Sequence, residues 1–489
     1  MINDILQSAN YLLLMVSFDD LKKILVNNYQ DEDINVVIKA FHFASVAHRG
    51  QKRRTGEDYI YHALATAYNL AEMKMDIPSI AAGLLHDVPE DTDFTLDDIK
   101  DNFGKEIAEL VAGVTKLGTL KYRGLERYAE NLRKMFLAMA KDLRVIIIKL
   151  ADRLHNMQTL EGVREEKRLR IAQETLEIYA PIANRLGMFE VKTRLEDLAF
   201  PYVYPSEYLW VKNLIQDRLK TELKYIEKIK KLAQKDLSKN NVNYLHIKGR
   251  VKSLFSLYQK LLRKGKDLNK IYDLIALRII VPDVTDCYSV LGVIHKRWTP
   301  LKGRVKDYIA QPKPNGYRSL HTSVFTEFGK IAEIQIRSQA MDEEAEFGIA
   351  AHSQYKELKN LVSKKNPPSW IKHLLEIQKN ITDNAEFIKH IKNDLFLNSI
   401  FVFTPKGDVI ELPENATPLD FAFHIHTDIG NKCVGAKIND QMVALNHSLK
   451  SGDVVEILID KNRKKPNPDW LNIVITAAAK EKIRSQLRK

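Results

Sequence analysis

The chain has 489 residues, of which 45% are hydrophobic, and it carries a formal net charge of +12. This length suggests about three domains, and the apolar share is typical of a globular protein, which excludes a disordered or fibrous chain. The positive balance favours anionic partners such as nucleotides or nucleic acid, although a protein that is basic without such a role would have the same composition.

The sequence contains two cysteines, Cys287 and Cys433, and no CxxC pair. We therefore predict a reducing, cytoplasmic environment and no thiolate metal site. The apolar run at residues 11–16 is too short to cross a bilayer. Asp4 stands where a signal peptide would have Lys or Arg. The run is interpreted as one face of a helix, and no membrane partner is expected.

Residues 1–200 are predicted to form an all-α domain. Apolar residues recur at spacings of three and four, as at Ile34, Val37 and Phe41, which is the pattern of one helix face. A charged helix, in which acids and bases stand at helix-neighbour spacing, is expected to continue over residues 201–242 as a connecting arm.

A candidate metal site lies within this helical region. Imidazole and carboxylate groups are ligands for ions such as Zn, Mn and Fe. Four candidate ligands stand on separate stretches of predicted helix: His62, His86, Asp87 and Asp152. Glu90 and Asp91 follow closely and add more negative charge than a helix surface tolerates without a cation nearby. A single buried histidine is usually a satisfied core residue, but the whole set favours a metal site.

The periodicity also predicts how this site is arranged. If residues 142–160 are helical, four polar side chains share one stripe of that helix: Asp152, His155, Asn156 and Thr159. Pro89 disfavours helical geometry at Val88, so Glu90 and Asp91 are expected in a turn that leaves the helix. A divalent cation lowers the pKa of bound water to about 7, and either acid could move the remaining proton. The sequence thus predicts a metal-dependent phosphohydrolase.

The pattern changes to mixed strands and helices over residues 243–395. A buried strand is predicted at residues 271–281 and ends at Pro282. A hairpin is predicted from residues 321–325 and 331–337. Strands mixed with helices indicate an α/β domain.

A second candidate site lies in this domain. Residues 248–318 contain sixteen basic and five acidic side chains. A solvated basic face is the usual explanation, yet Asp273 and Glu333 on strands could hold Mg²⁺. Five side chains could neutralise a polyphosphate: Arg250, Lys252, Arg304, Lys306 and Lys313. The Asn315–Gly316 turn could present Tyr317 to a base. Because the chain has no Walker A motif, we predict nucleotide phosphotransfer with side-chain phosphate contacts.

A small β-rich module of ubiquitin-like size is predicted at residues 396–460. Its signals are a hairpin at residues 400–412 and a closing strand at residues 454–458. Residues 461–489 are basic and are predicted to contain a short amphipathic helix.

From about residue 30 to residue 489, these motifs resemble those of the long RelA/SpoT homologues. The motifs that carry the resemblance are His86–Asp91, Lys149–Asn156, Gly249–Lys252, Arg304–Ile309, Asn315–Thr322 and Glu333–Arg337. The resemblance implies an all-α HD-type hydrolase domain, an α/β nucleotidyltransferase-like synthetase domain and a small β-grasp TGS domain. The regulatory C-terminal tail of long members would be missing.

For the first domain, the resemblance implies hydrolysis of the 3′-pyrophosphate of (p)ppGpp. Mn²⁺ would be held by the four ligands named above, and Glu90 and Asp91 would assist the attack of water. Four side chains would contact the nucleotide: Arg53, Arg54, Asn156 and Thr159.

For the second domain, it implies transfer of pyrophosphate from ATP to the 3′-OH of GTP or GDP. Asp273 and Glu333 would bind Mg²⁺, and one of them could act as base. Arg250 would stack on adenine and Tyr317 on guanine. The residues that would steady the acceptor are His321 and Lys313.

The resemblance implies that the TGS-like module contacts the 3′ end of tRNA through His426, for which a packed structural role is the alternative. The ribosome is a second partner that it implies for this module. Complete carboxylate sets and the basic Arg304–Asp307 segment predict that both activities are retained. The alternatives are a hydrolase with weak synthetase activity, an RNA nucleotidyltransferase joined to an HD domain, and a non-enzymatic tRNA or ribosome adaptor. Because simultaneous synthesis and hydrolysis would waste ATP, we expect each site to disfavour the other through the helices of residues 160–240.

Overall fold

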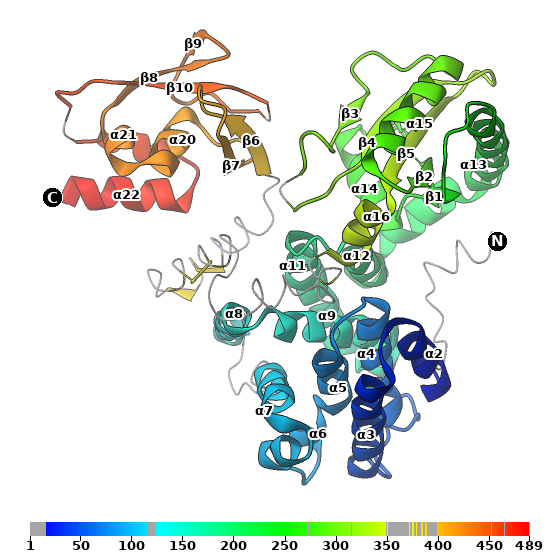
Figure 1. The fold of residues 1–489 in the computed structure, drawn as a ribbon. Coiled ribbons are helices and arrows are strands. Elements are labelled where there is room, and N and C mark those ends of the chain that lie inside the picture. Colours follow the sequence, from blue (N-terminus) through cyan, green and yellow to red (C-terminus); the bar gives the residue numbers. More distant parts are fainter. Residues whose placement is uncertain are drawn as a thin grey trace. The chain divides into compact units, whose positions relative to one another are not determined.

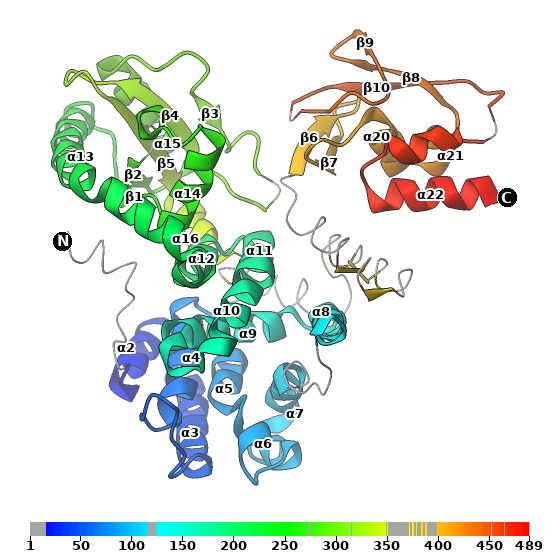
Figure 2. The same ribbon diagram turned by 180° about the vertical axis from the view of Figure 1, so that it is seen from behind.

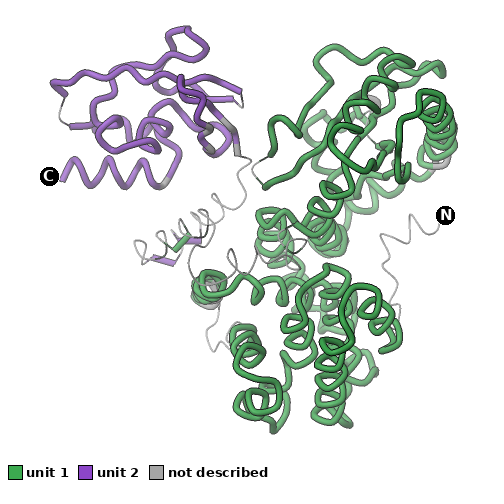
Figure 3. The backbone as a smooth tube through the Cα atoms, in the orientation of Figure 1, with its two compact units in different colours: residues 1–382 green, residues 383–489 purple. Residues whose placement is uncertain are grey.

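The computed structural model describes residues 16–115, 124–271, 274–313, 315–348, 350, 399–450, 452–463 and 465–488, and single residues between 371 and 388. The chain divides into two compact units, residues 1–382 and 383–489 (Figure 3). None of the helices described is long and apolar enough to span a bilayer.

The first part of unit 1 is helical, as predicted (Figure 1). Its first helices are α2 (Phe18–Asn28), α3 (Asp31–Ala47), α4 (Ile60–Glu72), α5 (Ile77–Leu85), α6 (Val88–Asp91), α7 (Leu96–Thr115), α8 (Gly124–Lys141) and α9 (Leu143–Gln158). They are followed by η1 (Leu160–Gly162), α10 (Glu165–Glu174), η2 (Thr175–Tyr179), α11 (Ala180–Arg185) and α12 (Phe189–Val203).

Helices α4, α5 and α9 pack together at the centre of this part. Small side chains allow the close approach of α4 and α5, since a Cβ atom at Gly83 would lie 2.5 Å from Leu70 Cδ1. Asp76 caps α5, whose N-terminal turn contains Pro78. The break between α5 and α6 falls at His86 and Asp87, and residues 88–91 form a separate helical turn. A helix boundary therefore precedes Pro89 as expected, but Val88 begins α6 and Glu90 and Asp91 are helical, so the predicted turn at these two acids is wrong.

The second part of unit 1 contains a five-stranded sheet with the order β1-β2-β5-β4-β3. The strands are β1 (His246–Val251), β2 (Ile275–Val281), β3 (Lys306–Asp307), β4 (Leu320–Phe325) and β5 (Ile331–Ser338). Strands β2 and β5 are parallel, and the other pairs are antiparallel. The predicted hairpin of β4 and β5 is confirmed, whereas β2 begins at Ile275 rather than at residue 271. The helices here are α13 (Pro205–Lys239), α14 (Leu254–Arg263), η3 (Leu268–Lys270), α15 (Val284–Arg297) and α16 (Gln339–Phe347).

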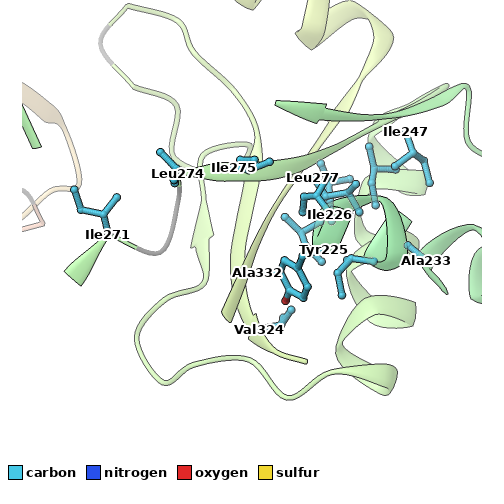
Figure 4. Packing of buried hydrophobic residues seen from close by; sticks show 14 of the residues in the cluster. Tyr225, Ile226, Ala233, Ile247, Ile271, Leu274, Ile275, Leu277, Val324 and Ala332 are labelled. Atoms are coloured by element: carbon cyan, nitrogen blue, oxygen red, sulfur yellow. The ribbon is translucent and has the colours of Figure 1, made fainter. Parts of the chain in front are cut away.

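Helix α13 covers the length of the predicted connecting arm, but it is also part of the core of the sheet domain. Its side chains Ile226, Ile229 and Ala233 are buried with Leu277 of β2 and Val324 of β4 in one apolar cluster. Figure 4 shows α13 packed against the sheet in this cluster, and Figure 2 shows the same region from behind. Although the sequence of α13 is highly charged, one stripe of the helix is apolar and packs against the sheet.

Unit 2 consists of β6 (Ser399–Phe403), β7 (Val409–Pro413), α20 (Pro418–Ile425), α21 (Thr427–Asn431), β8 (Cys433–Ile438), β9 (Gln441–Val443), β10 (Val455–Ile459), η5 (Pro468–Asn472) and α22 (Ala477–Arg488). The predicted hairpin and closing strand are present. The C-terminal segment packs on α20, because the buried Asp420 carboxylate accepts hydrogen bonds from Ile475 N at 3.1 Å and Thr476 N at 2.8 Å.

Candidate active sites

The four predicted metal ligands meet between α4, α5 and α9. His62 Nε2 lies 3.3 Å from Asp87 Oδ2 and 3.2 Å from Asp152 Oδ1. His86 Nε2 lies 3.1 Å from Asp87 Oδ2 and 3.9 Å from Asp152 Oδ1. The ligand atoms of His62, His86 and Asp87 are all within 4.8 Å of one another. Separate segments thus bring two imidazoles and two carboxylates to one point.

The hydrogen bonding of His86 is a further observation that fits a bound cation at this site. His86 Nδ1 lies 2.8 Å from the Gly83 carbonyl oxygen, which has no proton to give, so Nδ1 is the donor and Nε2 presents its lone pair to the site in the neutral ring. That Nε2 atom is buried and makes no hydrogen bond. A buried nitrogen that faces two carboxylates and makes no well-formed hydrogen bond to either is suited to be an imidazole ligand for a divalent ion.

The electrostatics keep both carboxylates ready to bind a cation. Although burial works against it, the charges of His86 and His62 hold the pKa of Asp87 well below its usual range. Burial also opposes ionisation of Asp152, but Lys149 Nζ, 2.6 Å from Asp152 Oδ2, holds its pKa well below the usual range. Burial lowers the pKa of His86, yet the Asp87 carboxylate outweighs this and raises it to about 9. Positive charge is therefore favoured in this pocket.

The two remaining acids lie at the edge of the same site. The Tyr59 hydroxyl is 2.8 Å from both Asp87 Oδ2 and Asp91 Oδ2, so Tyr59 links a predicted ligand to a predicted proton carrier. Glu90 is exposed, yet desolvation of its carboxyl group and the nearby Asp87 charge raise the pKa of Glu90 to about 7. A carboxyl group that titrates near neutral pH is suited to proton transfer.

The predicted nucleotide contacts of this site are partly assembled. Arg53 donates to Asn156 Oδ1 at 2.8 Å and to Thr159 Oγ1 at 2.9 Å. The three side chains therefore form one cluster beside the metal ligands, whereas Arg54 is exposed in the same loop.

The second site lies on one face of the five-stranded sheet. The strand register places Glu333 opposite both Ala276 and Ser323, and Gln335 opposite both Arg278 and His321. Because side chains alternate between the two faces of a strand, these polar residues share one face. The other face carries the apolar side chains packed against α13 and α15.

A cavity of about 360 Å³ opens on the polar face. Nine cationic and three acidic side chains line it, which suits a polyphosphate. The predicted residues that the cavity brings together are Arg250, Lys252, Arg304, Lys306, Lys313, Tyr317, His321 and Glu333. Asn315 is in the adjoining turn and is not among the lining residues. Asp273 lies outside the described residues.

The Tyr317 ring, which is predicted to stack on a base, is covered by neighbouring side chains in this structure. It is 8% exposed. Phe189 of α12 packs edge-on against it, with ring centroids 5.3 Å apart, and Lys313 Nζ lies 4.8 Å from its centroid. Its hydroxyl accepts from Arg337 at 2.8 Å and lies 2.8 Å from His321 Nε2. A base can therefore stack on Tyr317 only after its neighbours move.

Sequence reasoning missed several residues that complete these sites. Tyr59 and Lys149 contact the predicted metal ligands. Arg337 is 2% exposed and Phe189 lines the cavity from a helix of the other part. Two of them had a usable signal. Lys149 lies three residues before Asp152 on the same helix face, and Arg337 lies two residues after Gln335 on the same strand face.

His426 has a structural role in unit 2 and is also exposed. Its Nδ1 atom accepts from Asp428 N at 3.2 Å and so caps α21. His426 thus caps a helix, but its exposure is not that of the packed residue of the structural alternative, and its contact with tRNA stays a prediction.

Comparison with known proteins identifies three segments. Residues 40–189 match an HD domain, residues 249–360 match the region found in RelA / SpoT proteins, and residues 400–459 match a TGS domain.

Full-length relatives extend these matches. The chain is 46% identical to a GTP pyrophosphokinase of Myxococcus xanthus, a match that covers 94% of the chain and 61% of the relative. It is 47% identical to a guanosine-3′,5′-bis(diphosphate) 3′-pyrophosphohydrolase of Aquifex aeolicus (96% of the chain, 67% of the relative). It is 45% identical to the bifunctional (p)ppGpp synthase/hydrolase SpoT of Escherichia coli (97% and 68%). The matched part thus spans between three fifths and about two thirds of the length of these relatives.

Proposed function

The chain belongs to the RelA/SpoT family, and on this premise we propose that it both hydrolyses and synthesises (p)ppGpp. The observation that carries the proposal is the presence of two chemically different candidate sites in unit 1. One gathers four metal ligands, and the other is a cation-lined cavity large enough for part of a nucleotide.

In the proposed hydrolysis, water attacks the 3′-pyrophosphate of (p)ppGpp, and pyrophosphate leaves from the ribose 3′-oxygen. Mn²⁺, held by His62, His86, Asp87 and Asp152, would supply a bound water of lowered pKa. Glu90 takes the proton that remains on this water. Asp91, which accepts a hydrogen bond from Tyr59, helps to orient this water, Glu90 passes the proton to the leaving 3′-oxygen, and the Arg53 cluster binds the nucleotide phosphates.

In the proposed synthesis, the 3′-OH of GTP or GDP attacks the β-phosphorus of ATP, and AMP leaves. Arg250, Lys252, Arg304 and Lys306 bind the ATP phosphates, and Arg250 also stacks on adenine. Mg²⁺ would be held by Asp273 and Glu333 and would neutralise charge on the transferred group. A carboxylate of this pair accepts the proton of the 3′-OH.

The acceptor nucleotide is proposed to bind at the other end of the cavity. Tyr317 stacks on guanine, while Lys313, Asn315 and His321 hold the acceptor. Because Phe189 packs against Tyr317 in this structure, acceptor binding is coupled to a movement of α12.

We further propose that α12 couples the two sites. This helix lines the synthetase cavity through Phe189 and Lys192 and packs against α9, which carries Asp152. Just before α12, Gly187 approaches the loop that bears Tyr317, since its Cβ would lie 3.1 Å from Asn315 O. A coupling of about 1–3 kcal/mol would bias the sites several-fold to about a hundredfold. Each activity should fall when an inert analogue saturates the other site, and independent activities would contradict the coupling.

For unit 2, the proposed partner is the 3′ end of tRNA, with His426 as the contact residue. His426→Ala, compared with the exposed His424→Ala, should weaken binding of uncharged tRNA in a filter assay.

The main test is thin-layer separation of products from labelled ATP with GTP or GDP, and from labelled ppGpp with Mn²⁺. Asp152→Asn should abolish hydrolysis alone, and Glu333→Gln should abolish synthesis alone, so each variant is the control for the other. Loss of neither activity, or incorporation of AMP or CMP into added tRNA, would contradict the proposal. The second outcome would favour an RNA nucleotidyltransferase.

A further inference from the structure

His155 is the buried neighbour of the metal ligands to which no role has been assigned. It is 6% exposed and comes from α9, one turn after Asp152. Its Nδ1 atom lies 2.8 Å from Nδ1 of His62 and 3.4 Å from Nη1 of Arg53.

The proton positions in this contact follow from the chemistry of the three groups. A guanidinium group has only donors, so Arg53 can approach His155 Nδ1 favourably only if that nitrogen has its lone pair. His155 Nδ1 is therefore an acceptor. The facing Nδ1 of His62 must then carry the proton and donate to it, since two lone pairs at 2.8 Å would repel.

With its proton on Nδ1, the neutral His62 ring presents the lone pair of Nε2, which is the atom that faces Asp87 and Asp152. Histidine ligands of metals are commonly oriented through a hydrogen bond from their other ring nitrogen. For His86 this partner is the Gly83 carbonyl oxygen. For His62 it is another histidine.

We propose that His155 is a positioning residue, which fixes the ring and tautomer of His62 for metal binding and connects this ligand to the Arg53 cluster. The inference rests on the proposed metal-dependent hydrolase. It adds a physical link between the nucleotide contacts and the metal, because Arg53 also binds Asn156 and Thr159. If a substrate phosphate binds Arg53, the hydrogen bond from Arg53 to His155 Nδ1 is lost. His155 then accepts from His62 alone, which changes how the His62 ring is held.

The test measures the dissociation constant of the full chain for Mn²⁺ in the absence of nucleotide. Electron paramagnetic resonance reports the concentration of free Mn²⁺ during the titration. His155→Leu removes the acceptor and should weaken binding about 10- to 100-fold. His155→Gln keeps an acceptor oxygen and should restore binding to within a few-fold of the original protein. Met157→Leu, also buried on α9, is the control for disturbance of the helix. Thermal denaturation in EDTA reports whether the variants fold.

The outcomes separate the two levels of the argument. If the unaltered protein binds no Mn²⁺, the proposed hydrolase itself is wrong. If it binds Mn²⁺ and His155→Leu binds it equally well, or if His155→Gln is as weak as His155→Leu, the role of His155 is overturned. If His155→Leu does not fold, Arg53→Met tests the same contact from the Arg53 side. This variant should bind Mn²⁺ several-fold more weakly, and unchanged binding would overturn the proposed connection between Arg53 and the metal ligand His62.

Discussion

The pH dependence of hydrolysis tests the role of Glu90. Desolvation and the Asp87 charge raise the pKa of Glu90 to about 7. If Glu90 is the base, only its ionised form is active. The active fraction then rises from about one eleventh at pH 6 to about ten elevenths at pH 8, so kcat/KM should rise about tenfold. A bound cation favours the carboxylate and moves this rise to lower pH.

The assay is kcat/KM for ppGpp hydrolysis between pH 5 and 9 at constant Mn²⁺. Glu90→Gln should lower the rate about 10²- to 10⁴-fold, the usual contribution of a general acid or base, and should remove the rise. Asp97→Asn replaces an exposed acid in the first turn of α7 and should leave the profile unchanged. A Glu90→Gln variant that keeps both the rise and most of the rate would refute the assignment.

Three other predictions follow from buried contacts. Phe189→Ala should lower KM for GTP or GDP about 2- to 10-fold in steady-state synthesis with little change in kcat, since an edge-on aromatic pair contributes about 0.5–1.5 kcal/mol; an unchanged KM would contradict this. Asp342→Asn removes the carboxylate that Arg278 and Arg337 share at 3.3 and 3.0 Å. It should destabilise the fold by about 3–5 kcal/mol and lower the thermal midpoint, unlike a surface acid variant. Burial raises the pKa of Asp197 to about 7, so its contribution to stability is complete below about pH 4 and is lost as pH rises through about 7. Asp197→Asn should reduce the change of the thermal midpoint with pH between pH 5 and 8. An unchanged pH dependence would contradict the assignment of this change to Asp197.

The sequence was most informative where chemistry depends on residues close together in the chain. The pair His86 and Asp87 indicates a candidate metal site locally, and the stripe that includes Asp152 and Asn156 follows from helical periodicity alone. The alternation along β5 likewise separates Glu333 and the next polar residues from the apolar face.

The sequence was least informative about which residues pack against each face of a helix or strand. Periodicity reports that a side chain is buried, but it does not identify the residue that faces it. The contact of Tyr59 with Asp91 and that of Phe189 with Tyr317 depend on packing of distant segments. The charged composition of α13 similarly hid the narrow stripe by which it joins the sheet core.

The position of α12 gives a physical reason why the two proposed activities need not run together. A helix that packs on α9 and also lines the synthetase cavity cannot move without changing both sites. The free energy required is small, since about 1.4 kcal/mol already changes an equilibrium tenfold, and the contact of Phe189 with Tyr317 is of that order. Coupling of binding is reciprocal. If acceptor nucleotide displaces Phe189 and thereby weakens ligand binding at the hydrolase, a hydrolase ligand must weaken acceptor binding by the same factor.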